Sequence, residues 1–498
     1  MIKKLLIGAF FFIGLSYSQP PPDVSATDEV FFLLRRNQTQ AQTVYPAQNA
    51  PQSRDVYQNI KNSPTLSAYD QYTLKHQFPF GGKPLLNWRD TVRQHTFFLS
   101  PQAFVRWLDT GSTQSIQGVG MRIHGSLFKN LAFYSHGLIY TENSNTAQYS
   151  HQFDPDYGET CSVEQMPDEG LVSSQTCARF EYYLRWDLPY LKIKAGRDNL
   201  HMGPGYFTSL TASRNTAPYY HIEGRIDFSD WFVLDNYFLQ MTDTDHSFKK
   251  WAHIHRFEFT PHSSLSLAFQ DVVIYQERSP DFTYMLPLVP LAFAEDNSGG
   301  LDNDAMSFDF LYTGLPYFST WGELFIDDLQ GPTTFFDDLW ENRWATLVGF
   351  QVTSPLKAVD ADFVFEYSRV EPWTYNGRQR YTSFRHYNRP SASQWGPDSR
   401  TFDFKASYRP FKEVEWTEHF EIDDKGQQPG ASQLGEIHDN EKHGTRKRFL
   451  AGNFSHQISL SHGLRLQWHQ FLTGYLTYTQ SFRGGIENHL KTGLNFYW

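Results

Sequence analysis

Residues 179–187 read Arg-Phe-Glu-Tyr-Tyr-Leu-Arg-Trp-Asp, and the stretch alternates between two kinds of side chain. Phe180, Tyr182, Leu184 and Trp186 share one face, while the other face carries charged residues and one tyrosine. Successive side chains of a β-strand point to opposite faces, so this period of two predicts a strand with one apolar and one wet face.

The same alternation continues from residue 95 to the end of the chain. We expect about eighteen strands, at 95–107, 115–127, 130–141, 179–187, 190–197, 219–229, 231–241, 251–259, 264–275, 304–312, 317–328, 343–353, 360–370, 401–409, 412–422, 447–457, 463–476 and 486–498. An even number of strands is typical of single-chain bacterial outer-membrane barrels.

The connections between these strands differ in length in a regular way. Short ones are expected near Lys129 and at Leu188-Pro189, Asp230, Pro261-His262-Ser263, Gly314-Leu315-Pro316, Ser354-Pro355-Leu356, Pro410-Phe411 and Ser461-His462. Long ones cover 142–178, 198–218, 276–303, 371–400 and 423–446. Outer-membrane barrels have short periplasmic turns and long extracellular loops, so the pattern predicts an all-β, antiparallel transmembrane barrel with long extracellular loops.

Composition agrees with a barrel and excludes other classes. The chain of 498 residues has a formal charge of −11 and 17% aromatic residues, yet its mean hydropathy is −0.53. Disordered chains are poor in aromatic residues, and a spanning helix needs roughly 20 apolar residues in a row, which no stretch after residue 18 approaches. The acidic balance argues against nucleic acid as a partner.

The two ends of the chain indicate export to the outer membrane of a Gram-negative cell. Residues 1–18 carry Lys3 and Lys4, an apolar run and a small residue at position 18, which is typical of a secretory signal peptide. The chain ends on an aromatic strand, 494–498, and such a strand is expected to be read by the barrel-assembly machinery. Outer-membrane lipid is the other partner that a barrel implies.

Three units are therefore expected along the chain. They are the signal peptide at 1–18, a periplasmic N-terminal segment at 19–94 with one possible short helix after Thr27, and the barrel at 95–498. The only two cysteines, Cys161 and Cys177, lie in one expected loop, and in an exported protein they predict a disulfide.

Charged residues of both signs occupy the expected lumen, among them Arg185, Lys194, Glu223, Asp403 and Arg409. Either they line a pore or they form cross-strand ion pairs, and we favour the ion pairs because a conducting pore is usually biased to one sign. The acidic residues Asp327, Asp328, Asp337 and Asp338 predict a solvated loop rather than a calcium site, since their spacing fits no regular ligand pattern.

No nucleophile–base motif of a hydrolase and no zinc-protease motif is present in the sequence. We therefore expect no enzyme activity, no catalytic residue, no metal site and no cofactor.

Two segments stand apart from the strand pattern. The first, 196–218, contains Gly203-Pro204-Gly205, which predicts a tight turn, and the segment either folds into the barrel or forms an ordinary outer turn. The second, 367–397, sets rings beside Arg and Asn, a combination suited to sugar hydroxyls and sugar faces; self-packing of the loop is the open alternative. The predicted ligand-binding residues are Arg197, Arg214, Asn215, Arg369, Trp373, Tyr375, Tyr387, Asn388 and Arg389.

These two segments resemble the Wzi-type capsule assembly outer-membrane proteins. The run Gly196-Arg197, Gly203-Pro204-Gly205 and Ser213 to Pro218 is similar to a segment of that family, and 367–397 resembles its Bacteroidota branch, which includes barrels linked to gliding motility. Met202 departs from the family, which usually has Trp there, and 19–94 shows no helical bundle of the kind some members carry.

The resemblance implies an eighteen-stranded barrel that holds capsular or extracellular polysaccharide at the cell surface, lectin-like and without catalysis. Two other functions stay open. One is a substrate-specific porin, and the other is a structural component of a surface motility or secretion complex.

Overall fold

The computed structural model describes residues 85–497 apart from 91, 94, 110–112, 129, 145–159, 165–172, 215, 230, 243–248, 287–288, 298–301, 354–358, 388, 452–453, 470–471 and 484. The signal peptide, the possible helix after Thr27 and most of the N-terminal segment lie outside this range. No helix among the described residues is long and apolar enough to cross a membrane.

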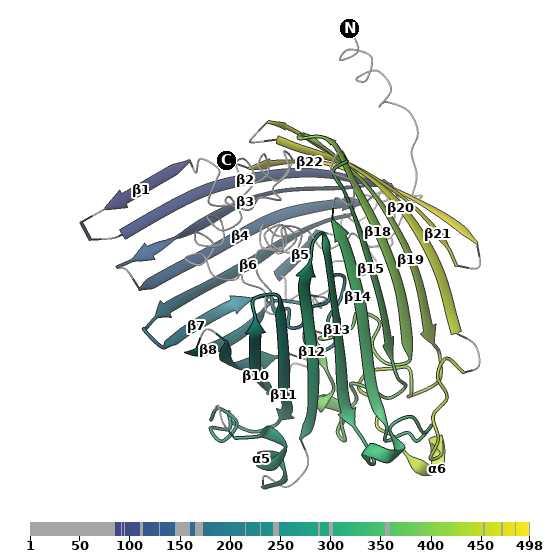
Figure 1. Ribbon diagram of the computed structural model, residues 1–498. Coiled ribbons are helices and arrows are strands. Elements are labelled where there is room, and N and C mark those ends of the chain that lie inside the picture. The colour runs from purple at the N-terminus through teal and green to yellow at the C-terminus, as the bar shows by residue number, and fades with distance from the viewer. Residues whose placement is uncertain are drawn as a thin grey trace.

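Eighteen strands of the described chain pair edge to edge into a closed antiparallel barrel, as Figure 1 shows. They are β2 (His95–Asp109), β3 (Thr113–Leu127), β4 (Leu131–Ser144), β6 (Ser173–Asp187), β7 (Leu191–Asp198), β8 (Tyr219–Ser229), β9 (Phe232–Met241), β10 (Lys250–His262), β11 (Leu265–Gln276), β12 (Asn303–Leu315), β13 (Phe318–Asp328), β14 (Arg343–Thr353), β15 (Ala361–Val370), β18 (Ser399–Phe411), β19 (Val414–Gly426), β20 (Phe454–His469), β21 (Leu472–Phe482) and β22 (Ile486–Tyr497).

The barrel closes where β2 meets β22, with Gln102 opposite Tyr497 and Asp109 opposite Leu490. Closure removes the free sheet edges, so every backbone polar group of a spanning strand has a partner within the barrel. The expected fold class is therefore confirmed.

Several short elements were not expected from the sequence. They are β1 (Leu86–Asp90), which extends the sheet beside β2, β5 (Thr160–Glu164), the small β16 (Arg385–His386) and β17 (Arg389–Pro390) pair, the helices α5 (Leu291–Asn297) and α6 (Asn440–His443), and the 3-10 turns η3 (Pro332–Thr334) and η4 (Arg380–Thr382). The division of the chain into three units stays a prediction. Strand β1 lies within the predicted N-terminal segment, 19–94.

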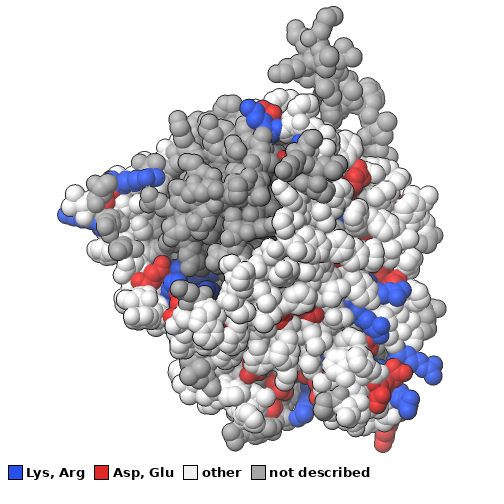
Figure 2. Space-filling view, in the orientation of Figure 1, with Lys and Arg blue, Asp and Glu red and all other residues white. Residues whose placement is uncertain are grey.

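The alternation in the sequence describes the wall of the barrel correctly. Phe180, Tyr182, Leu184 and Trp186 are exposed on the outside. A girdle of stacked rings, Phe228, Phe232 and Phe259, lies beside the short turns at one end. The wall seen in Figure 2 is largely uncharged, and Lys, Arg, Asp and Glu gather toward the lower end, where the long connections lie.

Two turns were predicted at the wrong place. Pro410 and Phe411 were expected to form a turn but end β18, and β19 begins at Val414, so the turn lies at 412–413. The larger error concerns β20. The sequence places a turn at Ser461-His462, but both residues lie inside β20, where Ser461 is opposite His419. Strands expected at 447–457 and 463–476 are in fact β20 and β21, at 454–469 and 472–482. Small polar residues suit a wet lumen as well as a turn. Gly463 leaves room for the Thr417 side chain opposite, whose Oγ1 would lie 2.2 Å from a Cβ at position 463.

Cys161 lies directly opposite Cys177 in the pairing of β5 with β6. Cβ atoms of directly opposed residues come within about 4.5–5.5 Å of each other, close to the separation that a disulfide needs. The disulfide stays a prediction that this register supports.

Candidate functional site

The most unusual feature of the barrel is what fills it. Residues 198–218 follow β7, turn into the lumen and pack there, with Leu200, Met202 and Leu210 almost fully buried against side chains of the wall. We call residues 198–218 together with 371–398 the plug. The inward fold of 198–218 confirms one of the two interpretations of this segment, and the ordinary outer turn is wrong.

The turn of the plug depends on its glycines. Gly203 has a φ of 116°, a conformation that side chains rarely adopt. A Cβ on Gly205 would lie 1.7 Å from the carbonyl oxygen of Thr208, so only glycine fits that turn. Met202 and Ala212 pair across it, with a hydrogen bond of 2.8 Å from Met202 N to Ala212 O.

Two carboxylates of the wall hold the turn. Glu366 of β15 accepts hydrogen bonds from the backbone N–H groups of Tyr206 (2.6 Å), Phe207 (3.0 Å) and Thr208 (3.2 Å). It also accepts one from the indole N–H of Trp321, at 2.8 Å. Such bonds are charge-assisted and stronger than neutral ones.

Glu323 of β13 anchors the next residues of the same loop. It accepts from the backbone N–H of Leu210 and from the hydroxyl of Thr211, both at 2.9 Å. Side chains of β13 and β15 therefore satisfy backbone N–H groups of a loop that does not join the sheet of the barrel.

The second part of the plug docks on the first. Ser213 N donates to Ser391 O at 2.8 Å, and the Tyr375 hydroxyl donates to Leu210 O at 3.0 Å. His386 stacks on Tyr219, with ring centroids 4.3 Å apart, and its Nδ1 accepts from Thr242 N at 2.9 Å. The two segments singled out in the sequence are thus packed on each other inside one barrel.

This packing separates the nine predicted ligand residues. Trp373 and Tyr375 are 3% and 0% exposed, and both are used in packing, so self-packing of the loop describes these two rings. Arg214, Tyr387 and Arg389 are half-buried parts of the plug. Asn215 and Asn388 lie outside the described residues.

The remaining two predicted ligand residues lie on the outer face of the wall, not in the lumen. Arg197 is opposite Tyr182 on one side and Tyr220 on the other, two rings that face lipid. Arg369 lies 4.0 Å from the ring centre of Phe449 and pairs with Glu371 at 2.7 Å. Ligand contact by any of the nine residues stays a prediction.

A hollow that the sequence did not reveal lies at the end of the barrel with the long connections. It has a volume of about 670 Å³ and is lined by Gln427, Phe454, Ser455, His456, Phe482, Arg483, Gly485 and Ile486. Phe454 and Phe482 are exposed there on the outer face of the wall, which they share with Ile458, the residue opposite Phe482. The misplaced turn at 461–462 concealed it, because the predicted strands put residues 454 and 482 at the wrong heights.

Luminal charges pair mostly as expected. Arg256 forms two hydrogen bonds with Asp309, at 2.6 and 3.2 Å, and both side chains are fully buried. Asp327 and Asp328 both pair with Arg343, at 3.4 and 3.0 Å, so they do not join the other two aspartates in a solvated loop.

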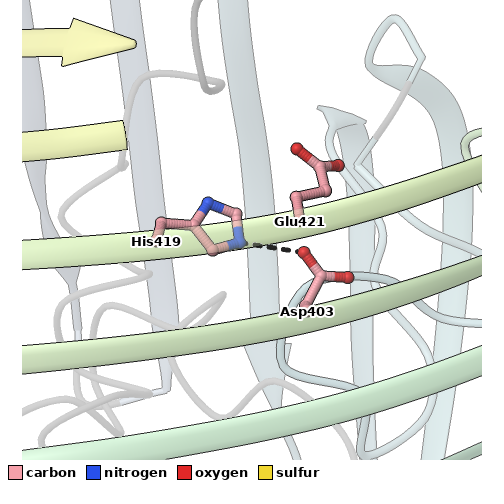
Figure 3. A group of neighbouring side chains, drawn as sticks. All are labelled: Asp403, His419 and Glu421. Carbon is pink, nitrogen blue, oxygen red and sulfur yellow. Dashed lines mark hydrogen bonds and ion pairs between the residues drawn. The ribbon is translucent and has the colours of Figure 1, made fainter. Parts of the chain in front are cut away.

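One luminal group departs from this pattern of opposite charges. Asp403, His419 and Glu421 each offer one ligand atom, and these atoms all lie within 4.8 Å of one another, as Figure 3 shows. It is the one such group found among the described residues.

Comparison with known proteins agrees with this architecture. The family model described as capsule assembly protein Wzi matches residues 114–482, well over half of the chain. This chain belongs to the Wzi family. The barrel is accordingly a protein of the Gram-negative outer membrane. Among curated proteins, none matches the sequence.

A solved Wzi structure has the same fold. It is described as an outer membrane protein involved in group 1 capsule assembly in Escherichia coli and as a carbohydrate-binding β-barrel. It is 12% identical, with 98% of this chain and 99% of that chain covered and a TM-score of 0.59. At this identity the likeness establishes the shared fold alone.

Two further solved structures show a weaker likeness. OccK3 (OpdO) of Pseudomonas aeruginosa is 10% identical, with 81% of this chain and 95% of that chain covered and a TM-score of 0.46. OccAB2 of Acinetobacter baumannii is 9% identical, with 81% and 98% covered and a TM-score of 0.46. Likeness at this level supports no conclusion about function.

Proposed function

We propose that this protein binds or organises capsular or extracellular polysaccharide at the cell surface, as a lectin-like barrel without catalytic activity. The observation that carries the proposal is the plug. A loop fixed by Glu323 and Glu366 inside the lumen suits a barrel that holds a polymer at its outer surface better than one that passes small solutes.

The hollow at the end with the long connections offers chemistry suited to sugars. In outer-membrane barrels that end faces the cell exterior. The rings of Phe454 and Phe482 can stack on the apolar faces of pyranoses, while Arg483, Gln427 and His456 can hydrogen-bond hydroxyl or carboxylate groups. Of the predicted contacts in the plug, Arg214, Tyr387 and Arg389 are only half-buried, so they are the ones available to a ligand.

A retention experiment tests the proposal. Purified protein in detergent is passed over immobilised capsular or extracellular polysaccharide from the cell that makes it, and we expect it to be retained. Phe454→Ala combined with Arg483→Ala should weaken retention about tenfold or more, because one stacking face and one charged donor are lost.

Trp416→Ala is the matched control. Trp416 is an exposed ring at the other end of β19, beside a short turn, so its loss should leave retention unchanged. A wild-type protein that is not retained would overturn the proposal.

Conductance separates this function from that of a substrate-specific porin. With the plug in place, a barrel inserted in a planar bilayer should carry little or no ion current. A large, steady current from the wild-type protein would favour the porin, and co-purification of a stoichiometric protein would favour a structural role in a surface complex.

A further inference from the structure

Two carboxylates of like charge oppose each other in the lumen. Asp403 of β18 is directly opposite Glu421 of β19, and His419 lies two residues earlier on the same face of β19. His419 Nε2 is 2.9 Å from Asp403 Oδ1. Like charges directly opposite on neighbouring strands are destabilising, so this pair needs a compensating positive charge or a proton.

The described residues supply no such cation by ion pairing. Neither Asp403 nor Glu421 forms an ion pair with a lysine or arginine of that part of the chain, and the one ion pair of Asp403 is with His419. Lys405, the nearest cation in the register, lies opposite His419. Its ammonium group donates to the Tyr206 hydroxyl at 3.4 Å, on the side of the plug.

A third carboxylate makes the excess of negative charge larger. Asp423 follows Glu421 on the same face of β19, is 4% exposed and lies close to Glu421. Its Oδ1 makes no hydrogen bond with any described residue. A buried carboxylate oxygen without a partner is costly, so this atom points independently to a ligand at the same place.

We propose that Asp403, His419 and Glu421 bind a divalent cation in the lumen, with Asp423 completing or supporting the site. One imidazole and two or three carboxylates suit Zn²⁺ or Mn²⁺, whereas Ca²⁺ and Mg²⁺ prefer oxygen ligands alone. Donor atoms around such an ion lie about 3–3.5 Å apart. The atoms here lie within 4.8 Å of one another, so rotation of the side chains closes the site.

The surroundings suit an ion that enters from the lumen. The side chain of His419 is 28% exposed, which leaves a path for a hydrated ion. The ring of Phe207 stacks on the imidazole, with centroids 4.9 Å apart and planes at 4°. Phe207 belongs to the plug and also donates its N–H to Glu366. An ion bound to His419 would therefore fix the imidazole on which this plug residue packs.

Metal binding to the whole protein tests this site. The folded barrel in detergent is stripped with a chelator and dialysed, and the binding of Zn²⁺ and of Mn²⁺ is measured by titration calorimetry and by metal content after gel filtration. We expect one equivalent per chain, and Glu421→Gln should weaken binding at least about tenfold, since it removes one charged ligand.

Glu418→Gln is the control variant. Glu418 is on the same strand and pairs with His462 on the outer face of the barrel, so it should leave the luminal site unchanged. Each variant is checked for the unheated, compact gel mobility of a folded barrel. His419→Gln provides a second test if Glu421→Gln does not fold. Wild-type protein that binds neither ion, or equal binding in the luminal and control variants, would overturn the site.

Discussion

One cross-strand row of the lumen contains three carboxylates, and they differ in the partners that compensate their negative charge. Glu366, Asp403 and Glu421 lie side by side on β15, β18 and β19. Glu366 accepts four hydrogen bonds from the plug and the wall, whereas Asp403 and Glu421 face each other with one histidine beside them.

The difference shows what the plug does for the wall that it covers. Elsewhere in the lumen a buried charge meets its opposite, as Arg256 of β10 meets Asp309 of β12. Asp403 and Glu421 form no ion pair with a lysine or arginine of the described residues, and excess buried charge is either neutralised or bound. Glu366 is therefore satisfied by the plug and the wall, whereas the neighbouring pair of carboxylates calls for a ligand.

The largest effect is expected from breaking a satisfied pair. Arg256→Ala leaves Asp309 buried without its cation, which should lower the free energy of unfolding by about 3–5 kcal/mol. Urea unfolding in lipid vesicles measures it. Lys412→Ala removes one partner of an exposed pair, Lys412–Glu413 at 3.6 Å, and should cost less than about 1 kcal/mol. Equal losses in the two variants would contradict the comparison.

Next in size is the removal of the charge that holds the plug. In Glu366→Gln the new NH₂ group faces two N–H donors whichever way the amide is turned, because each carboxylate oxygen accepts two bonds. We expect a loss of about 2–4 kcal/mol and a larger ion current through the barrel.

Ser368→Ala, two residues along the same strand, removes a hydroxyl that contacts Thr401 rather than the plug. It should leave the current unchanged. If Glu366→Gln also leaves the current unchanged, the plug is not what closes the barrel.

Acid should loosen the plug by a smaller amount. Burial among the two plug segments lowers the pKa of His386 to about 3, from an ordinary 6.5. The folded state therefore prefers the neutral ring, whose Nδ1 accepts from Thr242 N. The contribution of the neutral His386 ring to the free energy of unfolding is complete above pH 6.5 and is lost as the pH falls toward 3. At about pH 4.5 the loss should be about 2–3 kcal/mol.

Stability as a function of pH in vesicles measures this effect, and His386→Asn is the informative variant. Its amide oxygen takes the place of Nδ1 as an acceptor but does not titrate. The variant should lose the step between pH 6.5 and 4.5, and a variant that keeps the whole step would assign it to other groups.

The smallest effect should have the opposite sign. In metal-free buffer, Asp403→Asn removes the repulsion between two opposed carboxylates and should raise the free energy of unfolding by about 0.2–1 kcal/mol. With Zn²⁺ present the wild-type protein should become the more stable of the two. A loss of stability in metal-free buffer would show that the like-charged pair is compensated within the protein.

Much of this architecture was predictable from the sequence, since the period of two reports which face of each strand meets lipid. The predicted boundary is wrong at β20, where Ser455, Ser459 and Ser461 point toward the lumen. A wet lumen accepts the same small polar residues as a turn, so polarity alone does not place a boundary there.

The candidate sites were less predictable because they depend on contacts across long separations in the chain. Gly203 and Gly205 predicted a tight turn, but they did not indicate that side chains of β13 and β15 would hold it. The rings of Trp373 and Tyr375 looked suited to a sugar, yet the same apolar surface suits packing inside the plug. The opposition of Asp403 and Glu421 depends on the register of β18 and β19, which a turn predicted at 410–411 instead of 412–413 is enough to hide.

Recognition of main-chain amides by Glu366 also bears on how such a protein can diversify. The carboxylate contacts N–H groups at 206–208, which every residue type except proline possesses. Side chains at these positions can therefore change without loss of the anchor. The backbone position of the loop and the identity of its side chains are under separate control, so the sequence of 206–208 can diverge on a fixed frame.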